Sequence, residues 1–163
     1  MRLAGFYICG ALLLAMLPFG STAIPAQEES PFEKLIGRWV GDGRLGTRGG
    51  EVEIVKCRVT YRAGATANEL KQSIRCASHS GSIEVTTDVS HTAGALSGTW
   101  VETTRNWAGS LSGTVNPRGF RVTVKGENIA ANMDILVNGA RQIIEIQFLD
   151  GALLGLTLVL DKG

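Results

Sequence analysis

The residues of this chain that could do chemistry lie close together, between positions 100 and 107. Alternation of polar and apolar residues puts Trp100, Glu102 and Thr104 on the inward face of a predicted strand, with Arg105 and Trp107 in the turn after it. An inward carboxylate costs several kcal/mol unless it is paired, neutral or hydrated. Glu102 therefore indicates either a hydrated rim or an interior that holds water or a ligand, and the sequence leaves both open.

The tryptophan at position 107 favours ligand binding as the role of these residues. A tryptophan at an open barrel mouth offers a ligand an apolar ring and a polar N–H group. We predict a ligand-binding site formed by Trp100, Glu102, Thr104, Arg105 and Trp107. The alternative is that Trp107 folds back as a lid over the core.

Other chemistry finds little support. No nucleophile motif, phosphate-binding loop or metal-ligand spacing is present, so we predict no catalytic residue, no metal and no cofactor. His79 and His91 fall in turns at opposite ends of the predicted barrel, which argues against a shared metal or triad. Catalysis through Glu102 is disfavoured because no partner base or nucleophile can be named. The same alternation also turns Gln72, Thr87 and Gln142 inward.

Cys57 and Cys76 lie in two segments that alternate strictly between apolar and polar residues. Folding these segments about a turn at 63–68 sets Cys57 opposite Cys76 and Val59 opposite Ile74. Residues opposed in this way bring their Cα atoms within the range of a disulfide. We therefore predict a hairpin crosslinked by a Cys57–Cys76 bond.

A third strand extends this hairpin after Ser78–Gly81 and sets Arg75 opposite Glu84 and Lys71 opposite Asp88. Opposite charges across a strand pair favour such a register. The outer face of the hairpin is basic, which could attract a membrane surface. We favour a solvated face, because exposed ion pairs contribute little. Its cations are Lys56, Arg58, Arg62, Lys71 and Arg75.

Arg2 and the apolar run Leu3–Leu17 are typical of a secretory signal peptide, predicted to span residues 1–23 with cleavage after Ala23 or alternatively after Ala26. A membrane anchor is less favoured because about 20 apolar residues are needed to cross a bilayer. Removing Arg2 from 16 basic residues leaves 15 against 15 acidic ones, which argues against nucleic acid as a partner. We expect a periplasmic or secreted protein, where a disulfide persists.

Residues 24–29 form a predicted flexible lead-in, and residues 30–163 a single domain. A capping box at Ser30–Glu33 predicts a short helix at Pro31–Ile36. Trp39, Gly41, Gly43 and Leu45 then share one face of the first strand, and a slip in alternation between Ile54 and Val55 predicts a β-bulge.

Later turns set further expected pairings. Leu96, Gly98 and Trp100 are placed opposite Val89, Thr87 and Val85, respectively. A type I′ turn at Asn138–Gly139 places Met133 opposite Ile144 and Ala131 opposite Ile146. The length of the loop at Asp150–Gly151 decides which way Leu154, Leu156, Leu158 and Leu160 face, and the sequence does not fix it.

The whole pattern predicts an all-β, up-and-down antiparallel barrel of about ten strands with one short N-terminal helix. Closure removes the edges through which such a meander would aggregate. Gly37-Arg38-Trp39 after a short helix resembles the Gly-x-Trp element of lipocalins and other calycins. The resemblance implies that the helix plugs one barrel end and that Trp39 packs beneath the core. Only Thr87-Asp88 remains of a second lipocalin element, and Lys162 stands where those families carry an arginine.

The leading hypothesis is an exported, non-enzymatic protein that binds a small apolar or amphipathic ligand in its barrel. The alternative is a periplasmic protease inhibitor that inserts its arm, residues 24–30, into a protease cleft. That alternative rests on a second resemblance, to an eight-stranded secreted inhibitor barrel with one disulfide. An interior cavity of several hundred Å³ would favour the first hypothesis and a filled interior the second.

Overall fold

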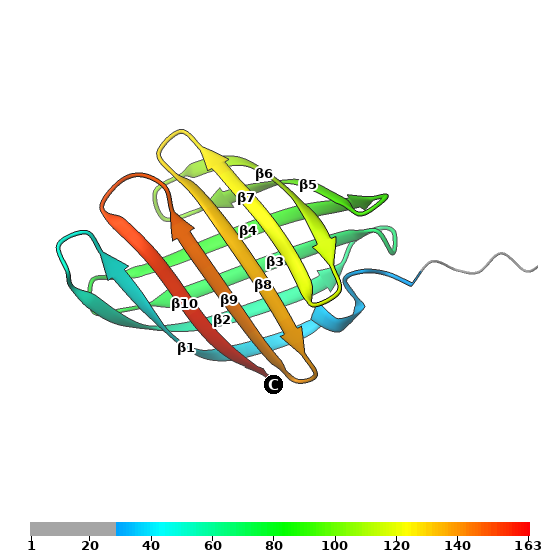
Figure 1. The fold of residues 1–163 in the computed structure, drawn as a ribbon, viewed down its shortest axis with the longest axis horizontal. Helices are drawn as coiled ribbons and strands as arrows, with labels where there is room; N and C mark the ends of the chain where they lie inside the picture. Colours follow the sequence, from blue (N-terminus) through cyan, green and yellow to red (C-terminus); the bar gives the residue numbers. More distant parts are fainter. Residues whose placement is uncertain (1–28) are drawn as a thin grey trace, which may run out of the picture.

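The computed structural model describes residues 29–163, so the predicted signal peptide and most of the lead-in lie outside the described residues. Ten antiparallel strands close into a barrel in which each strand pairs with its neighbours in the sequence and β1 pairs with β10 (Figure 1). The strands are β1 (Gly37–Thr47), β2 (Val52–Ala63), β3 (Glu69–Ala77), β4 (Ser82–Thr92), β5 (Ala95–Glu102), β6 (Trp107–Asn116), β7 (Gly119–Gly126), β8 (Ala130–Asn138), β9 (Arg141–Phe148) and β10 (Leu153–Lys162). The predicted all-β, ten-stranded, up-and-down barrel is confirmed.

The hairpin of β2 and β3 has the predicted register. Cys57 lies opposite Cys76 with their Cα atoms 4.2 Å apart, and the two side chains form the predicted disulfide. On the outer face of β3 and β4, Lys71 contacts Asp88 at 2.7 Å and Arg75 contacts Glu84 at 2.8 Å. Alternation and cross-strand charge were therefore enough to predict the register of β2, β3 and β4.

Two later registers were predicted wrongly, each by two residues. Leu96 lies opposite His91 rather than Val89, because Ala93 and Gly94, both with positive φ, form the turn and β4 continues to Thr92. In the β8–β9 hairpin the turn consists of Gly139 and Ala140, while Asn138 stays in the strand opposite Arg141. Met133 therefore lies opposite Ile146, and Ala131 lies opposite Phe148.

The predicted bulge between Ile54 and Val55 is absent, because β1 and β2 pair without interruption from Gly37↔Tyr61 to Gly46↔Val52. The slip in alternation instead reflects apolar side chains on the outer face, where Val52 and Ile54 are 55% and 59% exposed.

The predicted helix at Pro31–Ile36 is wrong, since the segment forms only a 3₁₀ turn, η1 (Glu33–Leu35). The Ser30 hydroxyl accepts a hydrogen bond of 3.3 Å from the Phe32 N–H, but the cap residue of the turn is Phe32, whose side chain makes no capping bond. Three residues are too few to build a cooperative α-helix.

The segment nevertheless closes one end of the barrel. Phe32 and Leu35 are both 2% exposed, and the Phe32 ring stacks on Phe120 with centroids 5.9 Å apart. The indole N–H of fully buried Trp39 donates to the Leu35 carbonyl at 2.7 Å. Figure 1 shows this segment in blue beside the β2–β3 turn. The expected position of Trp39 beneath a plug is therefore observed.

The first and last strands approach closely at the seam where the barrel closes. Gly41 and Gly43 lie in β1 opposite Leu160 and Leu158 of β10, and a Cβ atom at Gly41 would collide with the Val159 carbonyl. Glycine is therefore needed there for close approach of the backbones. Leu158 and Leu160 face inward at 2% and 0% exposure, which settles the orientation of the last strand.

Candidate functional site

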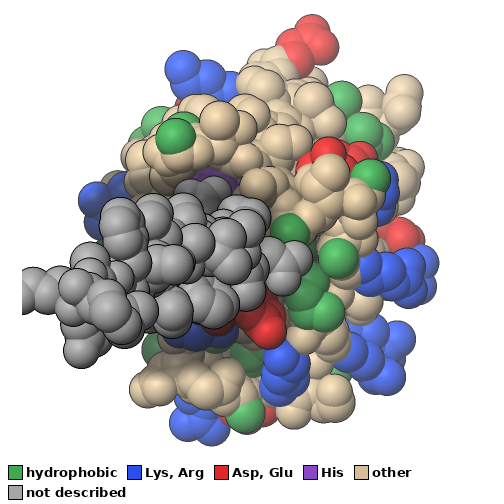
Figure 2. All heavy atoms as spheres, turned by 90° about the vertical axis from the view of Figure 1, so that its right-hand side faces the viewer, with side chains coloured by type: hydrophobic (Ala, Val, Ile, Leu, Met, Phe, Trp, Pro, Cys, Tyr) green, Lys and Arg blue, Asp and Glu red, His purple; other side chains and the backbone are tan. Residues whose placement is uncertain are grey.

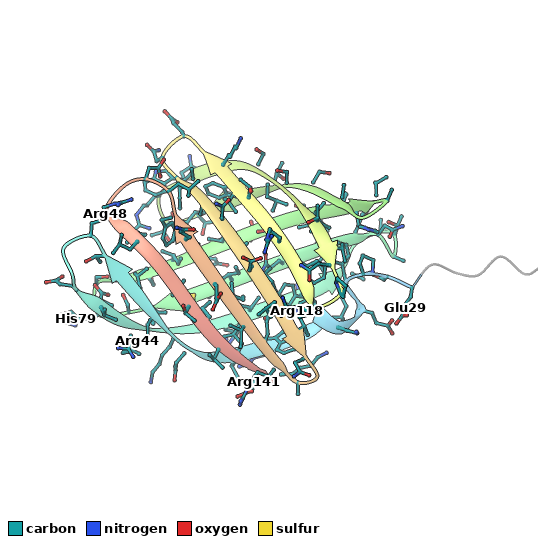
Figure 3. All side chains as sticks on the ribbon, in the orientation of Figure 1. Glu29, Arg44, Arg48, His79, Arg118 and Arg141 are labelled. Carbon is teal, nitrogen blue, oxygen red and sulfur yellow. A yellow bond between two sulfur atoms is a disulfide. The ribbon has the colours of Figure 1, made fainter. Side chains whose placement is uncertain are left out.

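The barrel encloses a cavity of about 410 Å³ that opens at the end opposite the 3₁₀ turn. It reaches residues 78, 80 and 81 of the β3–β4 turn, Ser82 at the start of β4 and Arg105 of the β5–β6 turn. In Figure 3, Arg48 and His79 lie at this open end, whereas Glu29 and Arg118 lie at the closed end. A ligand would therefore enter the barrel at the end formed by the β1–β2, β3–β4, β5–β6, β7–β8 and β9–β10 turns.

Most of the cavity wall is aliphatic or aromatic. Its inner surface includes Ile74, Leu111, Val124, Met133, Ile144, Ile146, Leu156 and Leu158. The wall also contains polar side chains: Gln72 of β3 and Thr87 of β4 in its interior, and Glu102 and Arg105 at the mouth. An apolar wall with a few convergent polar groups is typical of a small-molecule site.

Four of the five predicted site residues line this cavity, namely Trp100, Glu102, Arg105 and Trp107. Thr104 does not, and its predicted inward position is wrong. Strand β5 ends at Glu102, so Thr104 lies exposed in the turn, where its backbone N–H donates to the Glu102 carboxylate at 2.8 Å.

Trp107 is the first residue of β6 and lies opposite Glu102, so its predicted place within a turn is also wrong. It is half-buried and contributes to the cavity wall. The Arg105 guanidinium lies 5.5 Å from the centre of its ring, a cation–π distance. Trp107 and Arg105 thus form one side of the mouth.

Glu102 is 5% exposed, and each of its carboxylate oxygens accepts a hydrogen bond. It accepts hydrogen bonds of 2.8 Å from the backbone N–H groups of both Thr104 and Arg105, and the Arg105 guanidinium lies 3.7 Å away. Burial raises the pKa of Glu102, but the hydrogen bonds to Thr104 and Arg105 outweigh it and leave the pKa below its usual value. Pairing, rather than a hydrated rim, therefore holds this carboxylate inside.

A second polar group lies deeper, where sequence reasoning expected only separate inward residues. Gln142 is fully buried and donates a hydrogen bond of 2.8 Å to the hydroxyl of Tyr61, which is 2% exposed. Burial raises the pKa of Tyr61 to about 12, although Gln142 and then Gln72 act against this rise. Tyr61 lies opposite Gln72 in the β2–β3 pair, and the polar groups of these two inward residues were the signal that could have identified the cluster.

The cations of the predicted basic face lie on the outside of the β2–β3 hairpin. Lys56, Arg58 and Arg62 are exposed, and Lys71 and Arg75 have the acidic partners already described. Seen from the closed end, Lys and Arg side chains are spread around the barrel rather than gathered in one patch (Figure 2). Across residues 29–163, no helix is long and apolar enough to cross a membrane.

The two histidines lie at opposite ends of the barrel, as expected, but His91 lies in β4 opposite Leu96 rather than in a turn. His79 is exposed at the open end, and His91 at the closed end lies edge-on to Phe32 and accepts a hydrogen bond of 3.0 Å from the Gly94 N–H. Within the described residues, no three His, Cys, Asp or Glu side chains form a group that could hold a metal ion.

No protein-family model and no curated protein matches this chain. The structure of Rv2717c from M. tuberculosis is similar, with a TM-score of 0.67 at 12% identity over 81% of this chain and 94% of that one. The S-type phycobiliprotein lyase CPES from Guillardia theta has a TM-score of 0.58 at 12% identity, over 81% of this chain and 90% of the lyase. Both are calycin-like barrels, so the fold is calycin-like; at this identity the likeness shows the fold alone.

Proposed function

We propose that this chain is an exported, non-enzymatic protein that binds a small apolar or amphipathic ligand inside its barrel. The observation that carries the proposal is the cavity of about 410 Å³, within the range of roughly 300–1,000 Å³ typical of ligand pockets. A densely packed interior would have favoured a purely structural part or the protease inhibitor. The disulfide supports export, because such bonds persist in oxidising compartments.

Glu102 supports a role without catalysis. A general base is most effective when its pKa lies near the working pH. Although burial raises it, the pKa of Glu102 lies below its usual value because hydrogen bonds from Thr104 and Arg105 stabilise the carboxylate, which makes Glu102 a weaker base than an ordinary glutamate. The likeness to a lyase extends to the fold alone and brings no residue role to this chain.

The direct test is native mass spectrometry of the full chain, produced with its own leader and purified without detergent from the periplasm or medium. We expect a population that carries the additional mass of a small lipid-like molecule. Val124→Trp, which fills the cavity from its wall, should remove that mass, whereas Val159→Trp on the exposed outer face should retain it. Equal bound mass in both variants would place the ligand outside the barrel.

The inhibitor alternative has a separate test. Protease inhibition should be measured for the mature chain and for a chain lacking residues 24–30. We expect no inhibition from either chain, while inhibition that disappears with the arm would favour the alternative.

A further inference from the structure

The four most exposed large apolar side chains in residues 29–163 lie at the open end of the barrel, on one side of the cavity mouth. They are Val52 and Ile54 of β2, Leu149 of the β9–β10 turn and Leu154 of β10. Leu149 and Leu154 are 51% and 46% exposed, and the two residues of β2 are more exposed still. We call these four residues the apolar lip.

The apolar lip is one surface rather than four separate side chains. The Arg48 N–H donates a hydrogen bond of 2.8 Å to the Ala152 carbonyl, which joins the β1–β2 turn to the β9–β10 turn (Figure 1). Val52 lies opposite Gly46 of β1. On the other side of Gly46, the Leu154 Cβ lies 4.0 Å from the place that a side chain there would occupy. Because Gly46 has no side chain, nothing covers the strand between the two apolar residues.

A β-bulge turns Leu154 outward. Gly46 pairs with Gly155 and Thr47 pairs with Leu153, so Leu154 is an extra residue in β10. Without the bulge, Leu154 would share the inward face of the later leucines of β10. Instead Leu153 lines the cavity and its neighbour Leu154 lies on the outer surface. The apolar lip therefore adjoins the apolar wall of the cavity at these two leucines.

The size and position of the lip favour a lipid bilayer as the partner that covers it. A stable protein interface buries roughly 800 Å² and about 20–30 residues on each side, and four aliphatic side chains fall far short of that. Shallow insertion into a bilayer depends only on the apolar area that leaves water. A protein on the lip would also obstruct the mouth, whereas a bilayer is where a poorly soluble apolar ligand resides.

The charges around the lip are mixed. Arg44 lies opposite Ile54 on the outer face, and the two turns carry Arg48, Glu51 and Asp150. Two cations against two carboxylates give no preference for an anionic bilayer, so the attraction must come from apolar insertion. The basic outer face of the β2–β3 hairpin would behave differently, because binding through it would need anionic lipid and would weaken in salt.

We propose that the apolar lip inserts into the surface of a phospholipid bilayer and that the ligand passes between the bilayer and the cavity beside Leu153. In this orientation the mouth of the barrel faces the lipid, and an apolar ligand avoids a passage through water. This inference rests on the proposed binding function and adds an interaction surface and the source of the ligand.

Co-sedimentation with vesicles tests the docking. The exported chain, purified without detergent, is mixed with vesicles of phosphatidylcholine, or of phosphatidylcholine with phosphatidylglycerol. We expect similar binding to both, and retained binding when NaCl is raised from about 0.1 M to about 0.5 M, because apolar insertion is not screened by salt. Val52→Thr combined with Ile54→Thr keeps both side chains β-branched and should weaken binding about tenfold, which corresponds to about 1.4 kcal/mol.

A matched variant controls for the loss of exposed apolar surface elsewhere. Val40→Thr combined with Val159→Thr changes two exposed residues of β1 and β10 nearer the closed end and should leave vesicle binding unchanged. Binding of the uncharged fluorophore N-phenyl-1-naphthylamine without vesicles, and its displacement by decan-1-ol, tests the cavity separately and verifies that each variant is folded. Neither pair of substitutions should alter it, because none of these side chains lines the cavity.

The outcomes separate the two proposals. Absence of vesicle binding by a chain that binds the fluorophore would overturn the docking and leave the binding function standing. Equal loss in the lip and control variants would overturn the docking too, as would binding to anionic vesicles alone that disappears in salt. Self-association without vesicles that the lip variant abolishes would assign the lip to a second copy of this chain and overturn it as well. Vesicle binding without fluorophore binding would overturn the proposed function and, with it, the passage of a ligand.

Discussion

The amide of Gln142 on β9 donates a hydrogen bond of 2.8 Å to the hydroxyl of Tyr61 on β2, across the interior of the barrel. Both side chains are almost completely buried, at 0% and 2% exposure. The contact lies toward the closed end of the barrel, and neither residue is part of the cavity wall. It also makes Tyr61 a sensitive reporter of the interior.

We expect Tyr61 to remain protonated well above the ordinary tyrosine pKa of about 10. Burial raises its pKa to about 12, so in the unfolded chain the phenol ionises first. The contribution of Tyr61 to stability is therefore complete below about pH 10 and is lost as the pH rises toward 12, by up to about 1.4 kcal/mol per pH unit.

Ultraviolet absorbance of tyrosinate measures this directly, because Tyr61 is the one tyrosine in residues 29–163. Tyr61→Phe should show a shallower loss of stability above pH 10 than the natural chain. A native protein whose tyrosine titrates near pH 10 would contradict the burial of Tyr61.

Removing the disulfide should weaken the fold without changing it. Cys57→Ser combined with Cys76→Ser should lower the free energy of unfolding by about 2–4 kcal/mol, because the bond closes a loop in the unfolded chain. Denaturant unfolding measures the change. A reducing agent supplies the control, since it should destabilise the natural chain and leave the double variant unaffected. Free thiols in protein purified without reducing agent would contradict the bond.

Glu102→Gln should lower the free energy of unfolding and make it depend less on pH in the acid range. Replacing the carboxylate weakens the hydrogen bonds from Thr104 and Arg105, each a charge-assisted bond of the kind worth about 1.5–3 kcal/mol. Because the folded pKa of Glu102 is lowered, its stabilisation is present above the unfolded pKa of about 4.3 and is lost as the pH falls through the folded value.

Unfolding measured from neutral pH down to about pH 3 should therefore show a smaller acid loss in Glu102→Gln than in the natural chain. Glu127→Gln in the exposed β7–β8 turn is the control and should follow the natural profile. Parallel profiles for Glu102→Gln and the natural chain would show that the carboxylate is not held in this way.

Alternation predicted the faces of most strands correctly but not the number of residues in two turns. Moving one strand past another by two residues returns every side chain to the same face, so an error of two leaves the apolar pattern intact. This is what happened at Leu96 and Met133. The β3–β4 register escaped the error because Lys71 and Arg75 have acidic partners that a shift would separate.

Site residues that follow from the alternation of a single strand could be predicted from the sequence. Contacts that form only when the barrel closes could not. Trp100 and Glu102 follow the alternation of β5 and both line the cavity. The prediction for Thr104 was wrong because the strand ends at Glu102, whose carboxylate accepts a hydrogen bond from the Thr104 N–H. The Tyr61–Gln142 contact joins β2 to β9, and no local pattern in the sequence reports a contact made across the barrel.

Trp107 provides the last prediction, which concerns the mouth. Its ring is half-buried, opposite Glu102 and beneath the Arg105 guanidinium, so it is available to a ligand and contributes little to the core. Trp107→Ala should weaken binding of decan-1-ol about tenfold, the loss of about 1.4 kcal/mol of apolar contact, and cost less than about 1 kcal/mol of stability.

Intrinsic fluorescence and thermal unfolding together check this prediction. Ligand should change the tryptophan emission of the natural chain, and Trp107→Phe should abolish the change, which assigns the signal among Trp39, Trp100 and Trp107. Val101→Ala removes an exposed apolar side chain from the neighbouring strand and should affect neither binding nor emission. A large loss of stability with unchanged binding in Trp107→Ala would make Trp107 a structural residue, and the ligand would then enter past a different side of the mouth.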